Sequence, residues 1–513
     1  MASTLASAGH DTHVVSLASR GKVLLHAGTQ GLLPQLSFAR PGVVSWAEGR
    51  VRHHVVLTDQ PGPSEPAPAA DPADPGAAAG GLTAAVAARV AACVRDLTAC
   101  GSPAARAWVI LDADESQKPL RPTAPAASAP TSSTSASASS ASLFSHVVSA
   151  CPPGRCLALV QNVHFLPLGP SGSGARSGPQ REAWRGLGGV VAVSGFVEGY
   201  LREHWPREGQ EEGEGQGPFM PDIRVVPLAA WGAFGEGPFP DLAATARPLL
   251  HAWREAQRGR AEAAGQGPAS AGASRGPDEG TGAGAPSSPA SGPCVQLAVL
   301  KVTPEKGLAL VLELARRLQG RGVRFRCVAG DPAVFTALRS CGAPVALVEP
   351  QPGVEPVLRG CVGVLAPSLW LEAWGMVVTE ALLRGLPVLV SDLGGLPEAG
   401  LGLCPAVPVS PIEIPPGPDG VPDWAARRYP AQDVGAWEEA LLSLLMGGDI
   451  SARAADSVQG LGGDAAGMED AWERVSVCGR QAAQVHVARR QEYLNEFVEW
   501  LGGLAAAQAK QLS

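Results

Sequence analysis

The sequence predicts an α/β protein with doubly wound parallel sheets, and three observations support this prediction. Short apolar runs with the length of buried strands recur along the 513-residue chain, as parallel sheets covered on both faces require. Segments with helical periodicity separate these runs, which is the alternation typical of βαβ units. Glycine follows a helical pattern at Gly385, where it favours helix termination. The chain length suits two or three such domains.

The second half of the chain contains the clearest pattern. Residues 295–300 form an apolar strand pattern, and a loop containing Lys301 and Lys306 follows it. We expect a helix over 308–318, with one apolar face formed by Leu308, Val311, Leu312 and Ala315. Further expected elements are the strands 323–328, 361–366 and 387–390 and the helix 376–384.

The first half repeats this alternation with longer interruptions. Its expected elements are the strands 107–111, 156–160, 189–194 and 223–227 and the helix 196–204. Near the end of the chain, residues 485–501 predict an amphipathic helix. Its apolar positions recur at helical spacing and are Leu494, Phe497, Val498 and Leu501.

Four segments are too poor in apolar residues to offset the entropy of ordering them. They are residues 61–81, 118–142, 206–217 and 257–292. We interpret the first three as low-complexity insertions into an N-terminal domain, 1–256. The fourth is the expected flexible interdomain linker. A C-terminal Rossmann-like domain is expected over 293–470, and a helical segment over 471–513.

Composition excludes several classes of protein. A net charge of -8 and a pI near 5.7 argue against a nucleic-acid-binding protein. No run of 18 apolar residues predicts a transmembrane helix, although peripheral membrane contact stays open. The ten cysteines lack metal-ligand spacing and suit reduced thiols in a cytoplasmic protein. The Ala/Ser-rich start, which lacks acidic residues, also suits a plastid or other organellar location. The oligomeric state stays open.

The most informative stretch runs from Pro367 to Glu398. It reads as the end of a strand, a loop, a helix, a tight turn, a strand and a glycine-rich loop. Glu372 lies in the first loop and Glu380 lies early in the helix. Since ligands of parallel α/β sheets bind at the carboxyl ends of the strands, both carboxylates are expected at a ligand site.

This stretch resembles the retaining glycosyltransferases of the GT-B fold, family 4, also called glycosyl transferases group 1. The matching frame is Pro-Ser, Glu-x-Phe-Gly, Glu-Ala, Gly-x-Pro-Val and Gly-Gly-x-x-Glu, with Trp374 replacing the usual Phe. The resemblance implies two Rossmann-like domains that face each other across a cleft. It also implies a late helix that packs back on the N-terminal domain, and metal-independent hexosyl transfer from a nucleotide-diphosphate sugar to an acceptor. No cofactor is implied beyond this co-substrate.

The resemblance also suggests roles for individual residues. Glu380 is expected to bind the ribose hydroxyls of the donor nucleotide, and Glu372 to act as a catalytic residue on the donor sugar. Further expected donor-binding residues are Ser368, Gly375, Lys301 and Lys306. A departing diphosphate gains negative charge, so fixed cations and helix N-termini nearby would stabilise it.

Two further substitutions, besides Trp374, depart from the family pattern. Lys301 stands in place of the family Arg, and Leu300 in place of the Gly before it. Lysine supplies charge but not the bidentate fork of arginine. In the first half, His164 follows an apolar strand and enters a Gly/Pro-rich loop, which would place it at the expected cleft between the domains. The resemblance implies that a histidine near this position contacts the donor sugar, so His164 is the expected catalytic histidine.

The N-terminus and the exact function leave alternatives open. Residues 5–16 resemble the first helix and second strand of a GT-B N-terminal domain, which implies that the first strand is lacking. A non-catalytic GT-B protein that binds a nucleotide or sugar is one alternative, and a GT-B phosphorylase or nucleotide-sugar epimerase is another. The donor base, its sugar and the acceptor are not determined by the sequence.

Overall fold

The computed structural model describes sixteen parts of the chain. They are residues 6, 12–18, 37–40, 43–48, 51–57, 84–99, 108–112, 142–172, 178–205, 220–235, 237–265, 292–340, 345–351, 353–417, 422–448 and 470–511. The chain divides into two units. Unit 1 contains Met1–Ala233, Ile414–Arg427 and Arg489–Ser513, and unit 2 contains Phe234–Glu413 and Arg428–Ala488. None of the described helices combines the length and hydrophobicity that a membrane crossing requires.

Unit 2 is built on a six-stranded sheet in which every pair of neighbours is parallel. The strands are β9 (Val295–Val302), β10 (Val323–Ala329), β11 (Val345–Val348), β12 (Gly363–Ala366), β13 (Val388–Ser391) and β14 (Ala406–Val407). Their spatial order is β11-β10-β9-β12-β13-β14. This is the doubly wound Rossmann order, which reverses between β9 and β12. The loops that follow β9 and β12 therefore flank the position at which such sheets bind ligands.

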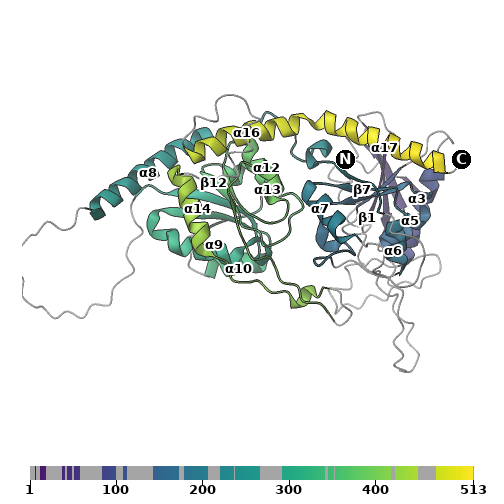
Figure 1. The fold of residues 1–513 in the computed structure, drawn as a ribbon, viewed down its shortest axis with the longest axis horizontal. Helices are drawn as coiled ribbons and strands as arrows, with labels where there is room; N and C mark the ends of the chain where they lie inside the picture. Colours follow the sequence, from purple (N-terminus) through teal and green to yellow (C-terminus); the bar gives the residue numbers. More distant parts are fainter. Residues whose placement is uncertain are drawn as a thin grey trace, which may run out of the picture. The chain divides into compact units, whose positions relative to one another are not determined.

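Helices pack against both faces of this sheet (Figure 1). They are α8 (Ala243–Gly265), α9 (Leu308–Leu318), α10 (Pro332–Ser340), α11 (Glu355–Leu358), α12 (Met376–Leu383), α13 (Leu396–Ala399), α14 (Val434–Met446) and α16 (Ala471–Ala488), with short 3-10 turns η4 (Pro304–Lys306) and η5 (Gln319–Arg321). Double coverage explains why β12 and β13 are apolar and buried throughout. Trp253 and Trp472 are fully buried, and each indole nitrogen donates to a backbone carbonyl oxygen, at 2.7 Å in both cases.

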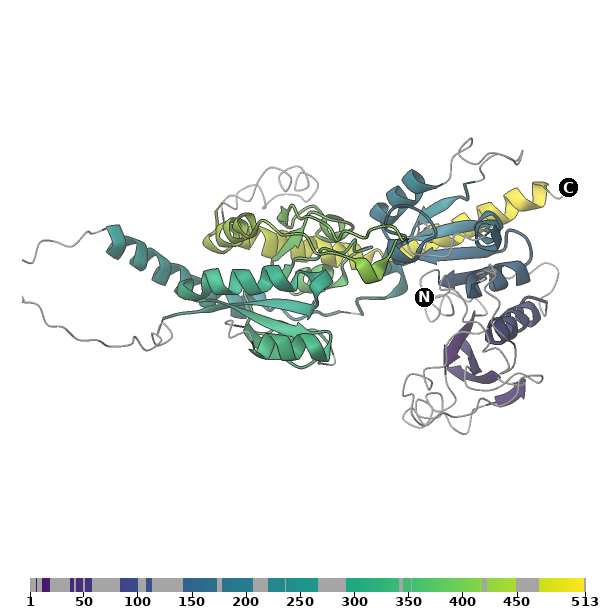
Figure 2. The same cartoon turned by 90° about the horizontal axis from the view of Figure 1, so that it is seen from below.

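Two expectations for unit 2 need correction. The buried stripe of α9 is Leu310, Val311, Leu314, Ala315 and Leu318, so the predicted face is rotated toward Leu310 and Leu314. Helix α8 continues past residue 256, where we expected the linker to begin (Figure 2). This segment is rich in Ala, Arg and Glu, which are strong helix formers, although its low apolar content suggested a linker. The chain passes from unit 1 to unit 2 at Ala233–Phe234.

The described strands of unit 1 form two separate sheets (Figure 2). The first is parallel, in the order β5 (Val109–Asp112), β6 (Cys156–Val160), β7 (Gly189–Ala192) and β8 (Ile223–Val225). The second has the order β1 (Thr12–Ala18), β4 (Val51–Leu57), β3 (Val43–Glu48) and β2 (Ser37–Arg40). In the second sheet only the pair β1–β4 is parallel. Because connections of a few residues cannot form a parallel crossover, the strands β2 to β4 pair antiparallel.

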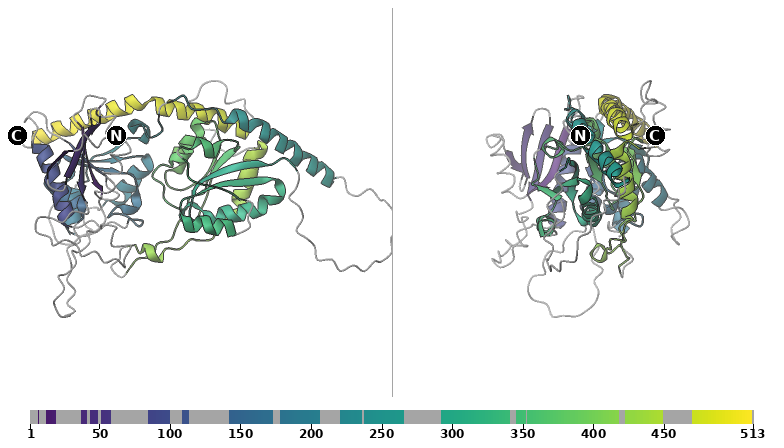
Figure 3. Two further views of the ribbon diagram at one scale, coloured as in Figure 1. Left: turned by 180° about the vertical axis from the view of Figure 1, so that it is seen from behind. Right: turned by 90° about the vertical axis from the view of Figure 1, so that its left-hand side faces the viewer.

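The remaining elements of unit 1 are helical. They are α3 (Ala84–Ala99), α5 (Leu143–Ala150), α6 (Gly178–Arg185), α7 (Gly195–His204) and α17 (Arg490–Gln511), with 3-10 turns η2 (Val163–Phe165), η3 (Leu228–Trp231) and η6 (Trp424–Ala426). The helix expected over 485–501 is two helices in the structure, α16 and α17. Figure 3 shows α17 in yellow. Its residue Phe497 is buried against the Trp231 ring, and Trp500 donates to Asp222 at 2.7 Å.

The predicted fold class, α/β with two Rossmann-like parallel-sheet domains, is confirmed. The parallel sheet of unit 1 and the six-stranded sheet of unit 2 both derive from the apolar runs read in the sequence. The low-complexity segments 61–81 and 206–217 lie outside the described residues, as do 118–141 and 266–291.

Candidate functional site

The loop between β12 and α12 places most of the predicted residues. It begins at Pro367, contains Ser368 and Glu372, and ends at Gly375, the N-cap of α12. Gly375 has a φ of 104°, and a Cβ there would lie 2.6 Å from the side chain of Leu396. A residue with a side chain would therefore meet both a backbone and a packing conflict. The amide of Val378 donates to the Gly375 carbonyl oxygen at 2.9 Å, and the amides at the start of any helix lack the i−4 carbonyl partners of its interior.

Glu372 is held by two side chains. Lys306 forms an ion pair with its Oε1, and Ser368 donates to the same oxygen at 3.0 Å. The Lys306 and Glu372 side chains are 29% and 21% exposed, so the pair is accessible but largely sheltered. Ser368 is 3% exposed and also accepts from the amide of Trp370 at 3.3 Å. A cation and a carboxylate thus lie in contact at the carboxyl edge of the sheet.

The Gly394–Gly395 pair of the sequence frame fixes the backbone of Glu372. The amide of Gly395 donates to the Glu372 carbonyl oxygen at 2.7 Å. A Cβ at Gly395 would lie 2.7 Å from the carbonyl carbon of Ala373. Since backbone cannot move as easily as a flexible side chain, only glycine permits this approach. The glycine pair near the end of the sequence frame therefore fixes the backbone of the loop that carries Glu372.

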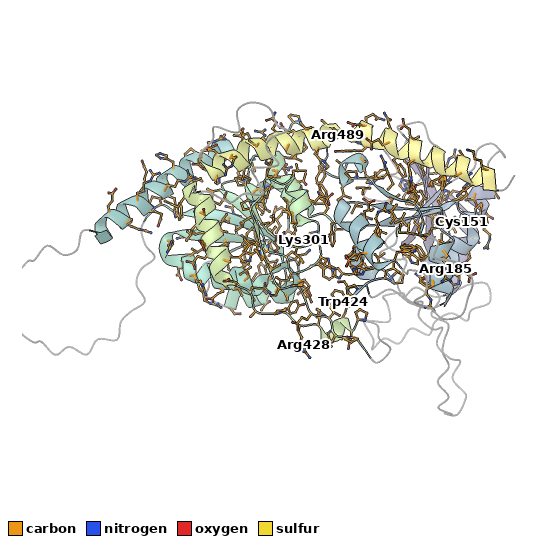
Figure 4. All side chains as sticks on the ribbon, viewed as in Figure 1. Cys151, Arg185, Lys301, Trp424, Arg428 and Arg489 are labelled. Carbon is orange, nitrogen blue, oxygen red and sulfur yellow. The ribbon has the colours of Figure 1, made fainter. Side chains whose placement is uncertain are left out.

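Lys301 lies on a β-bulge. Residues 327 and 329 of β10 pair with 299 and 302 of β9, so one extra residue is inserted in β9 at this point. Lys301 has a φ of 52°, which is unusual for a residue other than glycine, and it is exposed (Figure 4). Bulges next to functional sites redirect side chains. Here the bulge turns a lysine out of the strand at the edge where Lys306 and Glu372 lie.

Glu380 lies in the second turn of α12 and is half-buried. Burial raises the pKa of its carboxyl group. The positive charges of Arg384 and Lys301 lower this pKa, and the negative charge of Glu355 raises it further. Lys301 and Lys306 lie at the end of β9 and just after it, and Glu372 and Glu380 follow β12, the strand that pairs with β9. Because the two strands are parallel, the sheet brings these four predicted residues to one edge of unit 2.

The substitution Trp374 is accommodated by a specific partner. Its indole nitrogen donates to Thr379 Oγ1 at 3.0 Å, and its ring stacks on His486 of α16 at 5.3 Å between centroids. Trp374 is 4% exposed. Because the polar nitrogen of the larger ring is satisfied, Trp fills the Phe position of the frame without an unpaired buried donor.

His164 lies in unit 1, on η2 directly after β6. Asn162 caps this turn by accepting from the His164 amide at 3.0 Å. The His164 ring is 3% exposed and meets the ring of Trp424 edge to face, with centroids 5.0 Å apart. Tyr200 holds the following loop, since its hydroxyl donates to the Leu168 carbonyl oxygen and accepts from the Ser171 amide. His164 is therefore a packed residue in a fixed loop.

Trp424 lies on the second of two described segments, 410–417 and 422–432, which pair through antiparallel bridges and which the sequence analysis did not predict (Figure 4). Gln432 exchanges two hydrogen bonds of 2.9 Å with the backbone of Ser410, and Glu413 and Arg428 pair as an antiparallel bridge. In unit 2, Tyr429 donates to Glu305, the neighbour of Lys306, at 2.6 Å. These segments contain few apolar residues and many prolines. Their sequence therefore shows no periodic pattern from which the pairing could be predicted.

Two further charged residues were missed. Arg384 donates to the Glu380 carbonyl oxygen at 2.7 Å and pairs with Glu355 through two nitrogens. The available signal was the spacing of Arg384 from Glu380, because residues four apart lie on the same side of a helix.

The arrangement in unit 2 suits a ligand with an anionic centre and neighbouring hydroxyl groups. Lys301, Lys306 and the N-terminus of α12 supply positive charge, and Glu372 and Glu380 can accept hydrogen bonds from hydroxyl groups. Among the described residues, no group of three or more His, Cys, Asp or Glu side chains is arranged to hold a metal ion.

Comparison with known proteins agrees with this arrangement. Residues 294–407 match the family model described as glycosyl transferases group 1. No curated protein sequence matches the chain. Among solved structures, the chain is similar to a glycosyltransferase from Rickettsia africae ESF-5, with 12% identity, a TM-score of 0.46 and coverage of 98% of this chain and 93% of that chain.

Two other solved structures are similar to this chain at comparably low sequence identity. Sucrose-phosphate synthase from Thermosynechococcus elongatus has 13% identity and a TM-score of 0.44, covering 96% of this chain and 100% of that chain. The catalytic domain of starch synthase IV from Arabidopsis thaliana, bound to ADP and acarbose, has 11% identity and a TM-score of 0.37, covering 88% and 84%. These likenesses are too distant to carry a functional argument. The family match spans β9 through β14 and contains the whole sequence frame, so residues 294–407 are the part of the chain that is similar to the glycosyl transferases group 1 family.

Proposed function

We propose that this protein is a retaining glycosyltransferase that moves a hexosyl group from a nucleotide-diphosphate sugar to an acceptor. The observation that supports the proposal most is the contact of Lys306, Glu372 and Ser368 within the family domain. A cation suited to a diphosphate lies against a carboxylate suited to sugar hydroxyls, beside the N-terminus of α12.

The proposed reaction breaks the bond between the anomeric carbon and the diphosphate oxygen. The electron pair leaves with the diphosphate, where Lys306, Lys301 and the α12 amides would stabilise the added negative charge. The sugar becomes positively charged, and Glu372 would stabilise that charge. The acceptor hydroxyl oxygen then bonds to the anomeric carbon on the face from which the diphosphate departs. Its proton passes to the diphosphate or to water. We assign no covalent sugar–enzyme intermediate.

The remaining residues would bind and orient the donor. Glu380 would accept hydrogen bonds from the ribose hydroxyls, and Ser368 would keep Glu372 in position through its 3.0 Å contact. Gly375 would let the diphosphate approach the backbone. In unit 1, His164 would contact the donor sugar. We propose that these fixed cations and helix amides replace a divalent metal ion, so that turnover should be insensitive to EDTA.

The test is a screen of the full-length protein against UDP-, ADP- and GDP-hexoses, by thermal shift and by release of free nucleotide. Lys306→Ala should abolish stabilisation by the donor, since the diphosphate loses its cation. Arg317→Ala is a matched control, because Arg317 lies near the C-terminal end of α9, about 14 Å along the helix from Leu308, whereas Lys306 precedes the helix. It should behave as the wild type.

The outcomes separate the proposed enzyme from the non-catalytic alternative. Stabilisation with slow release of nucleotide supports the transferase and names its donor. Stabilisation without release, even with simple sugar acceptors present, would favour a protein that binds nucleotide sugars without turnover. Equal stabilisation of wild type and Lys306→Ala would contradict the assigned site.

A further inference from the structure

The turn that carries Lys306 is held by hydrogen bonds to other parts of unit 2. Within η4, the amide of Lys306 donates to the Thr303 carbonyl oxygen at 3.0 Å. The carbonyl oxygen of Glu305 accepts from the amide of Leu369, in the loop after β12, at 2.9 Å, and its carboxylate accepts from the Tyr429 hydroxyl at 2.6 Å. None of the three residues of η4 is buried. Since burial does not fix this turn, its position depends on hydrogen bonds of this kind.

The paired segments 410–417 and 422–432 contact both loops of the candidate site. The amide of Ile412, on the first segment, donates to the Leu369 carbonyl oxygen at 3.2 Å, and Tyr429 lies on the second segment. The Leu369 side chain is 4% exposed, so packing fixes this point of contact. The loop that carries the candidate cation and the loop that carries the candidate carboxylate are therefore joined to each other and to the same pair of segments.

The contact between Tyr429 and Glu305 is the strongest of these hydrogen bonds by type. A hydroxyl that donates to a carboxylate forms a charge-assisted hydrogen bond, and 2.6 Å is the usual length for it. Tyrosine has two side-chain torsions, so ordering it costs less entropy than ordering a long flexible side chain. Tyr429 is 38% exposed. Because water competes for an exposed hydrogen bond, we expect a modest effect when the hydroxyl is removed.

We propose that Tyr429 is a positioning residue that holds the Glu305 carboxylate and thereby fixes the turn that presents Lys306 to the donor diphosphate. Lysine carries a point charge on a flexible stem. A fixed starting point for that stem reduces the ordering cost of bringing the ammonium to the ligand. The consequence for the diphosphate rests on the proposed function, whereas the fixing of the turn does not.

The direct test is hydrogen–deuterium exchange of the full-length protein, followed by mass spectrometry. Tyr429→Phe removes only the hydroxyl. We expect the peptides that contain the Lys306 and Leu369 amides to exchange up to about tenfold faster in this variant. Arg428→Ala is the matched control, because Arg428 is the preceding residue, is exposed, and pairs with Glu413 through its backbone (Figure 4). It should exchange like the wild type.

A double-mutant cycle shows whether Tyr429 acts through Glu305. Glu305→Gln keeps the size of the side chain and removes the charge of the acceptor. If the hydroxyl acts through this carboxylate, the double variant should exchange like the more affected single variant. Additive changes, or unchanged exchange in Tyr429→Phe, would overturn the proposal. Faster exchange in Arg428→Ala as well would indicate general loosening of the paired segments, and would also overturn it. Thermal unfolding checks that each variant folds.

A second readout connects the position of the turn to ligand binding. Dissociation constants are measured for UDP, ADP and GDP and for the three matching monophosphates. In Tyr429→Phe the affinity for the diphosphate should fall by about threefold to tenfold, and that for the monophosphate by less than about twofold, because the ligand with more negative charge depends more on Lys306. Loosening of the whole site would weaken both ligands equally and would contradict the proposed role.

Failure of the proposed function gives a different result. If the wild type binds none of the six nucleotides, the proposed function fails, and hydrogen exchange still decides whether Tyr429 fixes the turn. If exchange becomes faster in Tyr429→Phe while the affinity for the diphosphate stays at the wild-type value, the turn is held by Tyr429 but does not position Lys306 for the ligand. That result would overturn the positioning role.

Discussion

Unit 2 concentrates its predicted chemistry in one sequence frame, whereas unit 1 offers a single histidine in a packed loop. In unit 2, the parallel sheet is continuous across six strands, and the loops after β9 and β12 meet at its switch point. In unit 1, the described strands form two sheets, and His164 is 3% exposed beneath Trp424. The difference shows that most candidate residues of unit 2 depend on one short contiguous frame, whereas the position of His164 depends on tertiary packing against Trp424.

The largest expected effect concerns Glu372 in unit 2. Glu372→Gln should lower kcat by about 10²- to 10³-fold, because a neutral amide does not stabilise the positive sugar. UDP affinity should not fall, since Lys306 loses its carboxylate partner and becomes available to the diphosphate. Steady-state kinetics and UDP titration measure both effects. Glu438→Gln is the control, because Glu438 pairs with Arg317 at 3.6 Å on the α9–α14 side. Weaker UDP binding in Glu372→Gln would contradict the assigned roles.

The second effect tests whether the glycine pair positions the site. Gly395→Ala should destabilise the protein by about 2 kcal/mol, because its Cβ would overlap backbone atoms of Ala373 and displace the Glu372 loop. Thermal unfolding measures the loss. Gly199→Ala is a suitable control, since its Cβ would meet no atom within 4 Å. Full stability in Gly395→Ala would mean that the loop adapts and does not depend on this close approach.

The third effect concerns unit 1. Trp424→Ala should reduce kcat about tenfold by removing the ring that holds His164, whereas Trp424→Phe should retain most of the activity. Steady-state kinetics give kcat and the KM for the donor separately for both variants and for His164→Ala. If Trp424→Ala leaves kcat unchanged while His164→Ala lowers it, then the aromatic contact does not position the histidine.

The fourth effect uses the bulge at Lys301. Lys301→Gly should gain about 1 kcal/mol of stability, because glycine adopts positive φ without strain. Lys301→Ala keeps the strained backbone and should gain nothing. Both variants should weaken UDP binding, since both lose the cation. A lower melting temperature for Lys301→Gly than for Lys301→Ala would contradict the claim that the site stores strain.

The smallest effect concerns how Glu380 changes the stability of the protein as a function of pH. Its pKa is raised in the folded state, mainly by burial. The ionised form is therefore less favourable in the folded than in the unfolded chain, and stability increases as the pH falls through the folded pKa. Glu380→Gln should raise Tm at pH 7, and the difference should disappear near about pH 4, the usual range of glutamate. Equal Tm differences at both pH values would contradict this account.

Sequence patterns predicted elements of both units closely. The helix expected over 308–318 has these bounds in α9, and the strand expected over 156–160 has them in β6. The predicted buried face of α9 was wrong: it is rotated about the helix axis relative to the observed one. Leucines occur on several sides of this helix, and periodicity alone did not distinguish the buried ones. The antiparallel strands β2 to β4 were not predicted, since their alternating pattern is short and interrupted by polar residues.

The sequence by itself determined the strand–loop–helix frame around Glu372 and Glu380, because contiguous residues impose local geometry through their backbone preferences. Only the tertiary structure decided that Lys306 pairs with Glu372, that Arg384 pairs with Glu355 beside Glu380, and that Trp424 covers His164. The members of each pair lie far apart in the chain: 29 residues for Arg384 and Glu355, 66 for Lys306 and Glu372, and 260 for His164 and Trp424. No local pattern encodes such contacts; they follow from the sheet order and from the burial of charge, which requires a partner.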